Sequence, residues 1–224
     1  HISRLSMEDM RYDLEKSLQA LGTDHIDIYF YHRDDLKRPV GELLEQMEVF
    51  RKEGKILYYG CSNWTTSRMI EADAYAKSHG ITGFVANQNL YTLAAQHMKP
   101  FEDDTMVCVD EEAIRFYQTS NNTPMPYFSI CSGFFHHLAA KGDDAVKNSC
   151  YYTPENLKLA RGLQTLCKKY GCSITQALLG FFYVQAYPIV PLVGFSKISQ
   201  LEDALNSVHI PFTQEDYVEI GGIQ

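Results

Sequence analysis

The sequence has no uninterrupted apolar run of about 18 residues, the length that a bilayer-spanning helix needs. Its first residues, His1 to Arg4, also lack the basic stretch and apolar core of a secretory leader. Basic residues number 20 against 28 acidic ones and are dispersed, so the net charge is -8 and no basic face is expected. These absences argue against a membrane protein or a nucleic-acid binder, and they predict a cytoplasmic protein.

Cysteines and histidines at metal-binding spacing are also missing. No C-x-x-C pair occurs, so we expect reduced thiols that pack as small apolar side chains. His136 and His137 have no partner at the spacing of metal ligands, which predicts a solvated loop and no metal site. The six cysteines are Cys61, Cys108, Cys131, Cys150, Cys167 and Cys172.

What is present is the composition of a globular protein, and the 224 residues predict one α/β domain over the whole chain. A first helix follows the capping residue Ser6 and ends at Gly22, and a second opens at Pro39 and ends at Gly54. Their inward apolar residues are expected to be Met7, Met10, Leu14, Leu18 and Leu21, and then Val40, Leu43, Leu44, Met47 and Phe50. Further helices are expected at about Thr66 to Ser78, Glu111 to Ser120, from Pro154, from Ser173 through Phe182, from Ser199 to Ser207, and after Thr213.

Short apolar runs between these helices predict five strands, so helices and strands alternate along the chain. Strict alternation predicts a parallel sheet with right-handed crossovers, either open and doubly wound or part of an eight-stranded barrel. Two long segments, Tyr91 to Met106 and Cys131 to Thr153, are expected to be loops, with Phe101, Phe134 and Phe135 as an apolar lid. The predicted strands are Ile26 to His32, Ile56 to Cys61, Gly83 to Gln88, Met125 to Ile130, and Ile189 to Val193.

Each predicted strand ends in hydrogen-bonding side chains or a flexible Gly/Ser segment. One such residue means little, because a lone His32 is more often structural and Ser62 could cap the next helix. Ligands bind at the carboxyl ends of parallel strands, so polar ends after all five strands are harder to explain as structural. The set also suits a nicotinamide nucleotide. The carboxamide needs paired donors and acceptors, the ring an aromatic face, and the phosphates N–H groups and a cation near a helix start. In the same order, these needs are met by Ser62, Asn63 and Gln88, by Tyr127, and by Gly194 to Lys197.

Five runs of the sequence resemble successive strand-end motifs of the aldo-keto reductases. They are LGTDHIDIYFYHRDD, EGKILYYGCSNW, GFVANQNLYTLAAQ, PYFSICSGFF and PIVPLVGFSKISQLEDAL, and they cover essentially the whole chain. The resemblance implies a bacterial-type member with a (β/α)8 barrel, an NADP or NAD cofactor across the strand ends, and reversible reduction of a small carbonyl substrate. Whether the protein forms a homo-oligomer is left open by the sequence.

By the same resemblance, His32 is the histidine that donates a hydrogen bond to the substrate carbonyl. Ser62, Asn63 and Gln88 correspond to the carboxamide binders, and Tyr127 to the tyrosine that stacks on the nicotinamide ring. NADP is the first expectation from Lys197, although Ala204 stands where many members have Asn, so NAD stays open. The remaining correspondences are Ser129, Ser132 and Gly133 with the pyrophosphate cover, and Gly194, Phe195, Ser196, Lys197, Gln200 and Asp203 with the adenosine end.

The family's proton-donor tyrosine and its lysine and aspartate partners would precede His1. The resemblance therefore implies that this chain carries the last five βα units of the barrel, without the first three. An open barrel exposes unpaired strand edges, so we expect the segment alone to be marginally stable or to aggregate. Two other hypotheses remain: a non-catalytic nucleotide-binding or regulatory protein of the same fold, like the β subunits of potassium channels, and an inactive fragment.

Overall fold

The computed structural model describes residues 4–101 and 103–222. The chain divides into two compact units, His1–Gln88 with Thr119–Asn122 and Asn89–Gln118 with Thr123–Gln224. The first three residues, on which the expected lack of a leader partly depends, lie outside the described residues. The expectation of one domain over residues 1–224 stays a prediction.

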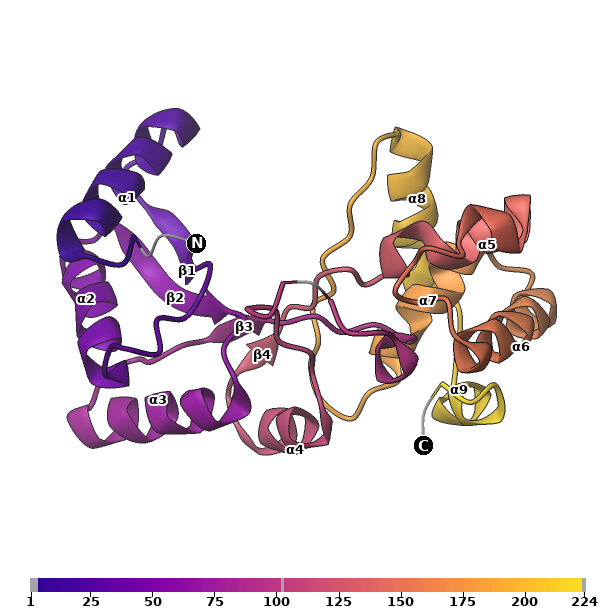
Figure 1. Cartoon of the computed structure of the whole chain (residues 1–224). Helices are drawn as coiled ribbons and strands as arrows, with labels where there is room; N and C mark the ends of the chain where they lie inside the picture. Colours follow the sequence, from indigo (N-terminus) through magenta and orange to yellow (C-terminus); the bar gives the residue numbers. More distant parts are fainter. Residues whose placement is uncertain (1–3, 102, 223–224) are drawn as a thin grey trace. The chain divides into compact units, whose positions relative to one another are not determined.

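Figure 1 labels the helices and strands of both units. The chain begins with α1 (Met7–Leu21), β1 (Ile26–Tyr31), α2 (Val40–Lys52), β2 (Ile56–Ser62), α3 (Thr66–His79) and β3 (Ala86–Gln88). It continues with η1 (Ala95–His97), α4 (Glu111–Thr119), β4 (Thr123–Pro124), η2 (Cys131–Gly133), α5 (Phe134–Lys141) and η3 (Asp143–Ala145). The last elements are α6 (Pro154–Tyr170), α7 (Ile174–Tyr183), α8 (Ile198–Asn206), η4 (Ser207–His209) and α9 (Gln214–Glu219).

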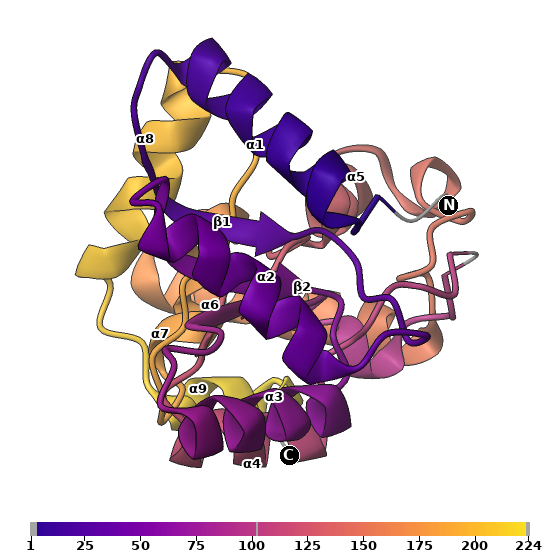
Figure 2. The same ribbon diagram turned by 90° about the vertical axis from the view of Figure 1, so that its left-hand side faces the viewer.

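The first unit is built on a parallel sheet, as predicted. Strand β1 pairs with β2, and β2 pairs with β3, both in parallel. Figure 2 shows α1 and α2 in front of β1 and β2, so these helices cover one face of the sheet. Because the strands are parallel, β1, β2 and β3 end at the same edge.

The predicted helix ends of the first unit are confirmed in α1. The Ser6 side chain accepts a hydrogen bond from the Asp9 N–H, and Gly22 takes the left-handed conformation that ends the helix. The five apolar positions predicted for α2 are fully buried. The prediction for Leu21 was wrong: 67% of its surface is exposed, because the buried stripe of α1 ends at Leu18.

Strand β1 is less buried than the sequence predicts. Tyr31 is buried, but Asp27 and Ile28 are exposed, although the run was expected to be a buried strand. The edge position of β1 does not explain this exposure, because β2 is paired on both sides and also carries exposed residues. On β2, Leu57 and Tyr58 are exposed as well.

Two strands were predicted in the second unit, and neither forms a regular strand. Within the predicted strand at Met125 to Ile130 the structure has only an isolated parallel bridge between Tyr127 and Leu90, and the short strand β4 lies just before it. The predicted strand at Ile189 to Val193 is an extended segment without strand assignment. Two hydrogen bonds still join these segments, Val190 N–H to Pro124 O at 3.0 Å and Leu192 N–H to Pro126 O at 2.8 Å. The prolines of both segments, Pro124, Pro126, Pro188 and Pro191, lack the N–H that would extend the ladder.

The predicted loop from Cys131 to Thr153 contains a helix, α5, that the sequence interpretation missed. Phe134 and Phe135 are only 2% exposed and pack in the core of the second unit, so they form no lid. His136 also lies on α5, half-buried, with its Nε2 3.0 Å from the Thr175 hydroxyl, and burial lowers its pKa. The prediction of a loop was therefore wrong for both histidines, because His137 also lies on α5, and only His137 is exposed to solvent.

Asp216 joins α9 to α6 in the second unit. Its carboxylate is 2% exposed and accepts hydrogen bonds from Lys169 Nζ at 2.6 Å, the Tyr170 hydroxyl at 2.8 Å and the Thr213 N–H at 2.8 Å. Burial raises the pKa of Asp216, but these bonds outweigh it and lower the pKa to about 2.

This pKa predicts a loss of stability in acid. A lowered folded pKa stabilises the protein above the ordinary Asp value, and the effect disappears as the pH falls toward 2. We expect Asp216→Asn to reduce the free energy of unfolding by about 2 kcal/mol at pH 6 and by progressively less below pH 4. Urea unfolding at several pH values measures this difference, with the exposed Asp144→Asn as the control. A difference that does not change with pH would contradict it.

Candidate functional site

The carboxyl edge of the first unit's sheet carries three of the predicted site residues at one level. Tyr31 of β1 pairs with Cys61 of β2, and Cys61 pairs with Asn87 of β3. The next residue along each of the three chains therefore lies beside the other two, in one row across the sheet. That row consists of His32, just after β1, and of Ser62 and Gln88, the last residues of β2 and β3. The structure thus brings the expected substrate-orienting histidine and two expected carboxamide binders to one edge.

Hydrogen bonds fix the ends of β2 and β3 against each other. The Ser62 hydroxyl donates to the Gln88 carbonyl at 2.8 Å, and the Asn63 N–H donates to the same carbonyl at 3.1 Å. The Asn63 side-chain amide donates to the Ser62 hydroxyl at 3.0 Å. Ser62 is not the cap of α3, because Thr65 accepts the capping bond from Arg68 N–H. The helix-cap alternative for Ser62 is therefore wrong.

Asn63 holds a backbone conformation that few residues tolerate. Its φ is 58°, in the left-handed region that Asn adopts more readily than other non-glycine residues. The turn sends the chain from β2 into Trp64, which is fully buried and packs edge-on against Phe84 at 4.7 Å. The side-chain amide of Asn87 donates to the Trp64 carbonyl at 3.1 Å. This bond joins β3 to the turn that follows β2.

Two tyrosines of the strands, Tyr31 and Tyr59, are buried and have structural partners. Tyr31 is 2% exposed and donates to the Leu43 carbonyl at 3.0 Å, and burial raises its pKa. Tyr59 is fully buried and donates to Glu48 at 3.0 Å, and burial also raises its pKa. Neither phenol can therefore serve as a proton donor at the strand ends.

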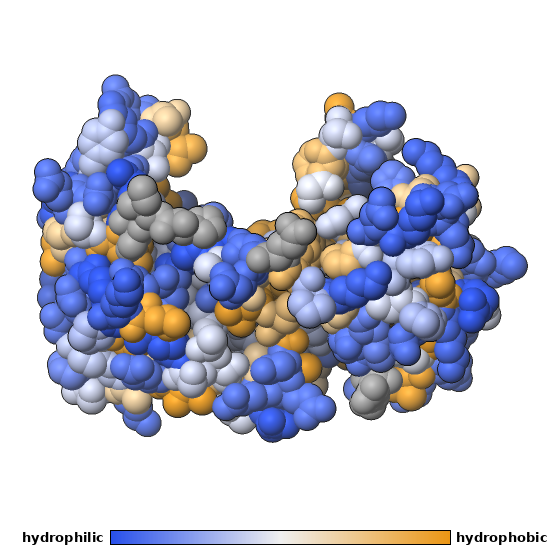
Figure 3. Space-filling view, in the orientation of Figure 1, coloured by the Kyte–Doolittle hydropathy of each residue, from blue (hydrophilic) through white to orange (hydrophobic). Residues whose placement is uncertain are grey.

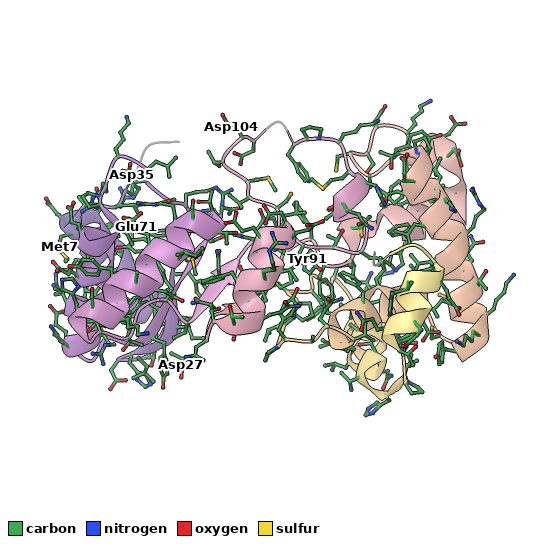
Figure 4. All side chains as sticks on the ribbon, turned by 90° about the horizontal axis from the view of Figure 1, so that it is seen from below. Met7, Asp27, Asp35, Glu71, Tyr91 and Asp104 are labelled. Carbon is green, nitrogen blue, oxygen red and sulfur yellow. The ribbon has the colours of Figure 1, made fainter. Side chains whose placement is uncertain are left out.

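The sequence interpretation missed an ion pair beside His32. The Arg68 guanidinium donates to both carboxylate oxygens of Asp34, at 2.8 and 2.9 Å, and to the Arg38 carbonyl at 3.2 Å. It also lies over the Trp64 ring, 5.0 Å from its centroid. The pair fastens the loop that begins at His32 to α3. Asp35 in this loop and Glu71 on α3 mark the two elements in Figure 4.

The second unit holds the other predicted residues. Tyr127 donates its N–H to the Asn89 carbonyl at 3.3 Å and packs edge-on against Phe128 at 5.2 Å. Ser129 is 1% exposed, and its hydroxyl donates to the Leu192 carbonyl. Ser129 thus joins the chain around Tyr127 to the segment that leads into Gly194.

A left-handed turn follows Tyr127. Cys131, Ser132 and Gly133 have φ values of 54°, 49° and 77°, and Phe128 has 58°. The Cys131 N–H donates to the Phe128 carbonyl at 2.7 Å, and the Gly133 N–H donates to the Ile130 carbonyl at 3.1 Å, so the turn is held by its own backbone hydrogen bonds. Gly133 is also the N-cap of α5, and no side chain caps that helix. Ser132 is exposed, whereas Cys131 is fully buried.

The segment before α8 is exposed and is held by a side-chain amide. The Gln200 oxygen accepts the N–H groups of Ser196 at 2.9 Å and Lys197 at 3.0 Å. Asp203 accepts a hydrogen bond from the Ser173 hydroxyl at 2.7 Å, which ties α8 to the start of α7. Both predicted side chains thus have structural partners. Figure 3 shows apolar surface in the region of α8, where Phe195 and Ile198 are exposed.

Among residues 4–101 and 103–222, no helix combines the length and the apolar character that crossing a membrane requires. In the same part of the chain, no three His, Cys, Asp or Glu residues are arranged to hold a metal ion.

A profile of the Aldo/keto reductase family matches residues 1–224. The chain belongs to this family. The uncharacterised oxidoreductase YrpG of Bacillus subtilis is 26% identical to it over 216 residues, covering 94% of this chain and 62% of that protein. An aryl-alcohol dehydrogenase of Pestalotiopsis microspora is 23% identical over 219 residues, covering 95% and 53%.

Solved aldo/keto reductases share the fold. The thermostable aldo-keto reductase Tm1743, crystallised with the inhibitor epalrestat, resembles the chain with a TM-score of 0.72 at 20% identity, covering 97% of this chain and 66% of that one. The parallel α/β, TIM-barrel-like fold of the aldo/keto reductases is thereby confirmed. The chain spans 53% and 62% of the two relatives above. That it carries only the last five units of a barrel stays a prediction.

Proposed function

We propose that this aldo/keto reductase chain supplies the NAD(P)H site and the substrate-orienting histidine of a carbonyl reductase. The observation that carries the proposal is the level row of His32, Ser62 and Gln88 at the carboxyl edge of three parallel strands. This edge is where ligands bind in parallel α/β proteins. Membership in a family of oxidoreductases supports it further.

The donor set suits a nicotinamide carboxamide. Ser62, Asn63 and Gln88 place a hydroxyl and two side-chain amides at one strand edge, where the bonds of Ser62 and Asn63 hold these groups in place. A side-chain amide carries both donor and acceptor groups, which a carboxamide requires. In the second unit we assign Tyr127 to the ring face, and Ser129 and the left-handed turn at Ser132 to the pyrophosphate. The segment from Gly194 to Lys197, with Gln200 and Asp203, is assigned to the adenosine end.

The reaction we propose is the reversible reduction of an aldehyde or ketone to an alcohol. The bound cofactor would supply the hydride. His32 would donate a hydrogen bond to the carbonyl oxygen, where negative charge develops, and so lower the barrier. Names of relatives, aryl-alcohol dehydrogenases among them, support an alcohol–carbonyl couple. Neither Tyr31 nor Tyr59 can be the acid, because both phenols are buried and already donate hydrogen bonds.

Titration of the purified chain with NADPH, followed by nucleotide fluorescence, tests the proposal. We expect saturable binding, and Gln88→Ala and Tyr127→Ala should each weaken it about tenfold through a lost hydrogen bond or stacking contact. Gln19→Ala, an exposed position on α1, is the matched control. The same titration with NADH compares the two cofactors.

Two outcomes would count against the proposal. Absence of binding at millimolar NADPH would contradict a cofactor site in this chain. Binding that neither Gln88→Ala nor Tyr127→Ala weakens would show that the nicotinamide lies elsewhere. Reduction of aromatic and aliphatic aldehydes, measured by NADPH consumption, then separates a reductase from a nucleotide-binding regulator.

A further inference from the structure

The corner between α6 and α7 holds two cysteines five residues apart. Helix α6 ends at Gly171, which takes a left-handed conformation with a φ of 62°. The N–H groups of Gly171 and Cys172 both donate to the carbonyl of Cys167, the second at 3.0 Å. This kind of helix end brings the residue after the glycine beside the last turn of the helix. The backbone therefore holds Cys172 next to Cys167.

The thiols of Cys167 and Cys172 are both half-buried and interact electrostatically within this corner. Burial raises the pKa of both thiols, that of Cys167 to about 12, and the neighbouring Cys172 adds to this rise. Two thiols that the backbone holds beside each other are the arrangement from which an intramolecular disulfide forms.

We propose that Cys167 and Cys172 are a reversible dithiol–disulfide pair that exchanges with a small-molecule disulfide such as oxidised glutathione. One of the two cysteines attacks, as its thiolate, one glutathione sulfur, forming a mixed disulfide and releasing one glutathione thiolate. The other cysteine then attacks the protein sulfur of this mixed disulfide and releases the second glutathione thiolate. The two protein thiols lose two electrons and two protons, and glutathione disulfide gains them as two glutathione thiols.

The corner is placed to couple this modification to its neighbours. Ser173 follows Cys172 directly and begins α7 as its N-cap. Its hydroxyl donates to Asp203 on α8, and the Gln176 side-chain amide donates to the Asp203 carbonyl at 3.2 Å. A disulfide between Cys167 and Cys172 would therefore stiffen the point at which α6, α7 and α8 meet.

The test is equilibration of the full chain in glutathione redox buffers, followed by alkylation, trypsin digestion and mass spectrometry. Trypsin cuts after Lys168 and Lys169, between the two cysteines, so a disulfide joins the peptides 162–168 and 170–197. We expect this linked pair in oxidising buffer and its loss in reducing buffer. Detection of Cys167 and Cys172 only as free thiols or glutathione adducts, at every ratio, would overturn the proposal.

Two comparisons show whether the fold creates the pair. The folded chain should form the disulfide at an oxidised-to-reduced glutathione ratio on the order of tenfold lower than the chain in urea, because the helix end holds the sulfurs together. Gly171→Ala strains the left-handed helix end and should raise the required ratio. Equal ratios for folded, unfolded and variant chains would overturn the role of the corner. Cys150→Ser, which removes another half-buried thiol, should leave the linked peptides unchanged.

Discussion

Arg68→Ala is expected to lower the free energy of unfolding of the first unit by about 3 kcal/mol. The Asp34 side chain is 7% exposed and that of Arg68 13%, so the substitution leaves a nearly buried carboxylate without its bidentate partner. It also removes the cation over the Trp64 ring. Trp64 is the single tryptophan of the chain and is fully buried, so its fluorescence during urea unfolding reports on this unit.

Arg4→Ala is the matched control for this experiment. Two nitrogens of Arg4 donate hydrogen bonds to the carboxylate of Asp13. This pair is exposed, however: 51% of the Arg4 side chain and 43% of the Asp13 side chain are accessible to solvent. Solvent screens an exposed pair, so the control should change the unfolding midpoint little. Equal effects of the two substitutions would show that burial does not make the Asp34–Arg68 pair important. Arg68→Lys, which keeps the charge and loses the planar fork, should fall between them.

Gly180→Ala should destabilise the second unit, against the usual effect of this change in a helix. Alanine normally favours a helix over glycine by about 1 kcal/mol. At this position in α7 the new methyl group would lie 2.3 Å from both the Phe212 ring and the Tyr217 hydroxyl. Tyr217 is fully buried, and its hydroxyl donates to the Ala177 carbonyl at 2.7 Å. We expect a net loss of about 2–3 kcal/mol from overpacking and this broken bond.

The Gly180 prediction is measured by urea unfolding followed by circular dichroism. Gly194→Ala is the control, because a methyl group there meets no atom within 4 Å and the backbone is not left-handed. Its effect should be within about 0.5 kcal/mol. An increase in stability for Gly180→Ala would mean that α7 and α9 separate easily, and would contradict the packing described here.

Local sequence signals predicted the helices of the first unit and the sheet edge that carries the first half of the candidate site. Ser6 and Gly22 bound α1 through their own capping chemistry, which needs no distant partner. Ser62 and Gln88 lie side by side because each is the last residue of its strand, and neighbouring parallel strands end at the same edge of the sheet. These features depend on neighbours in sequence, so pattern arguments were sufficient.

Contacts between distant residues decided what the pattern could not. Asp34 meets Arg68 across 34 positions, and two adjacent acidic residues after His32 gave only a faint hint of a cationic partner. The helix at Phe134 and Phe135 forms because both rings fill the core of the second unit, although glycine and serine around them suggested a loop.

The sequence by itself determined the order of helices and strands in the first unit, the parallel sheet of that unit, and the residue types at its carboxyl edge. It did so because periodicity and capping act over a few residues. Only the tertiary structure decided that Ser62 bonds to Gln88 instead of capping a helix, and that prolines interrupt the later strands. It also decided that the left-handed helix end at Gly171 places Cys172 beside Cys167. These outcomes depend on which groups meet after the chain folds, and single-residue preferences do not contain that information.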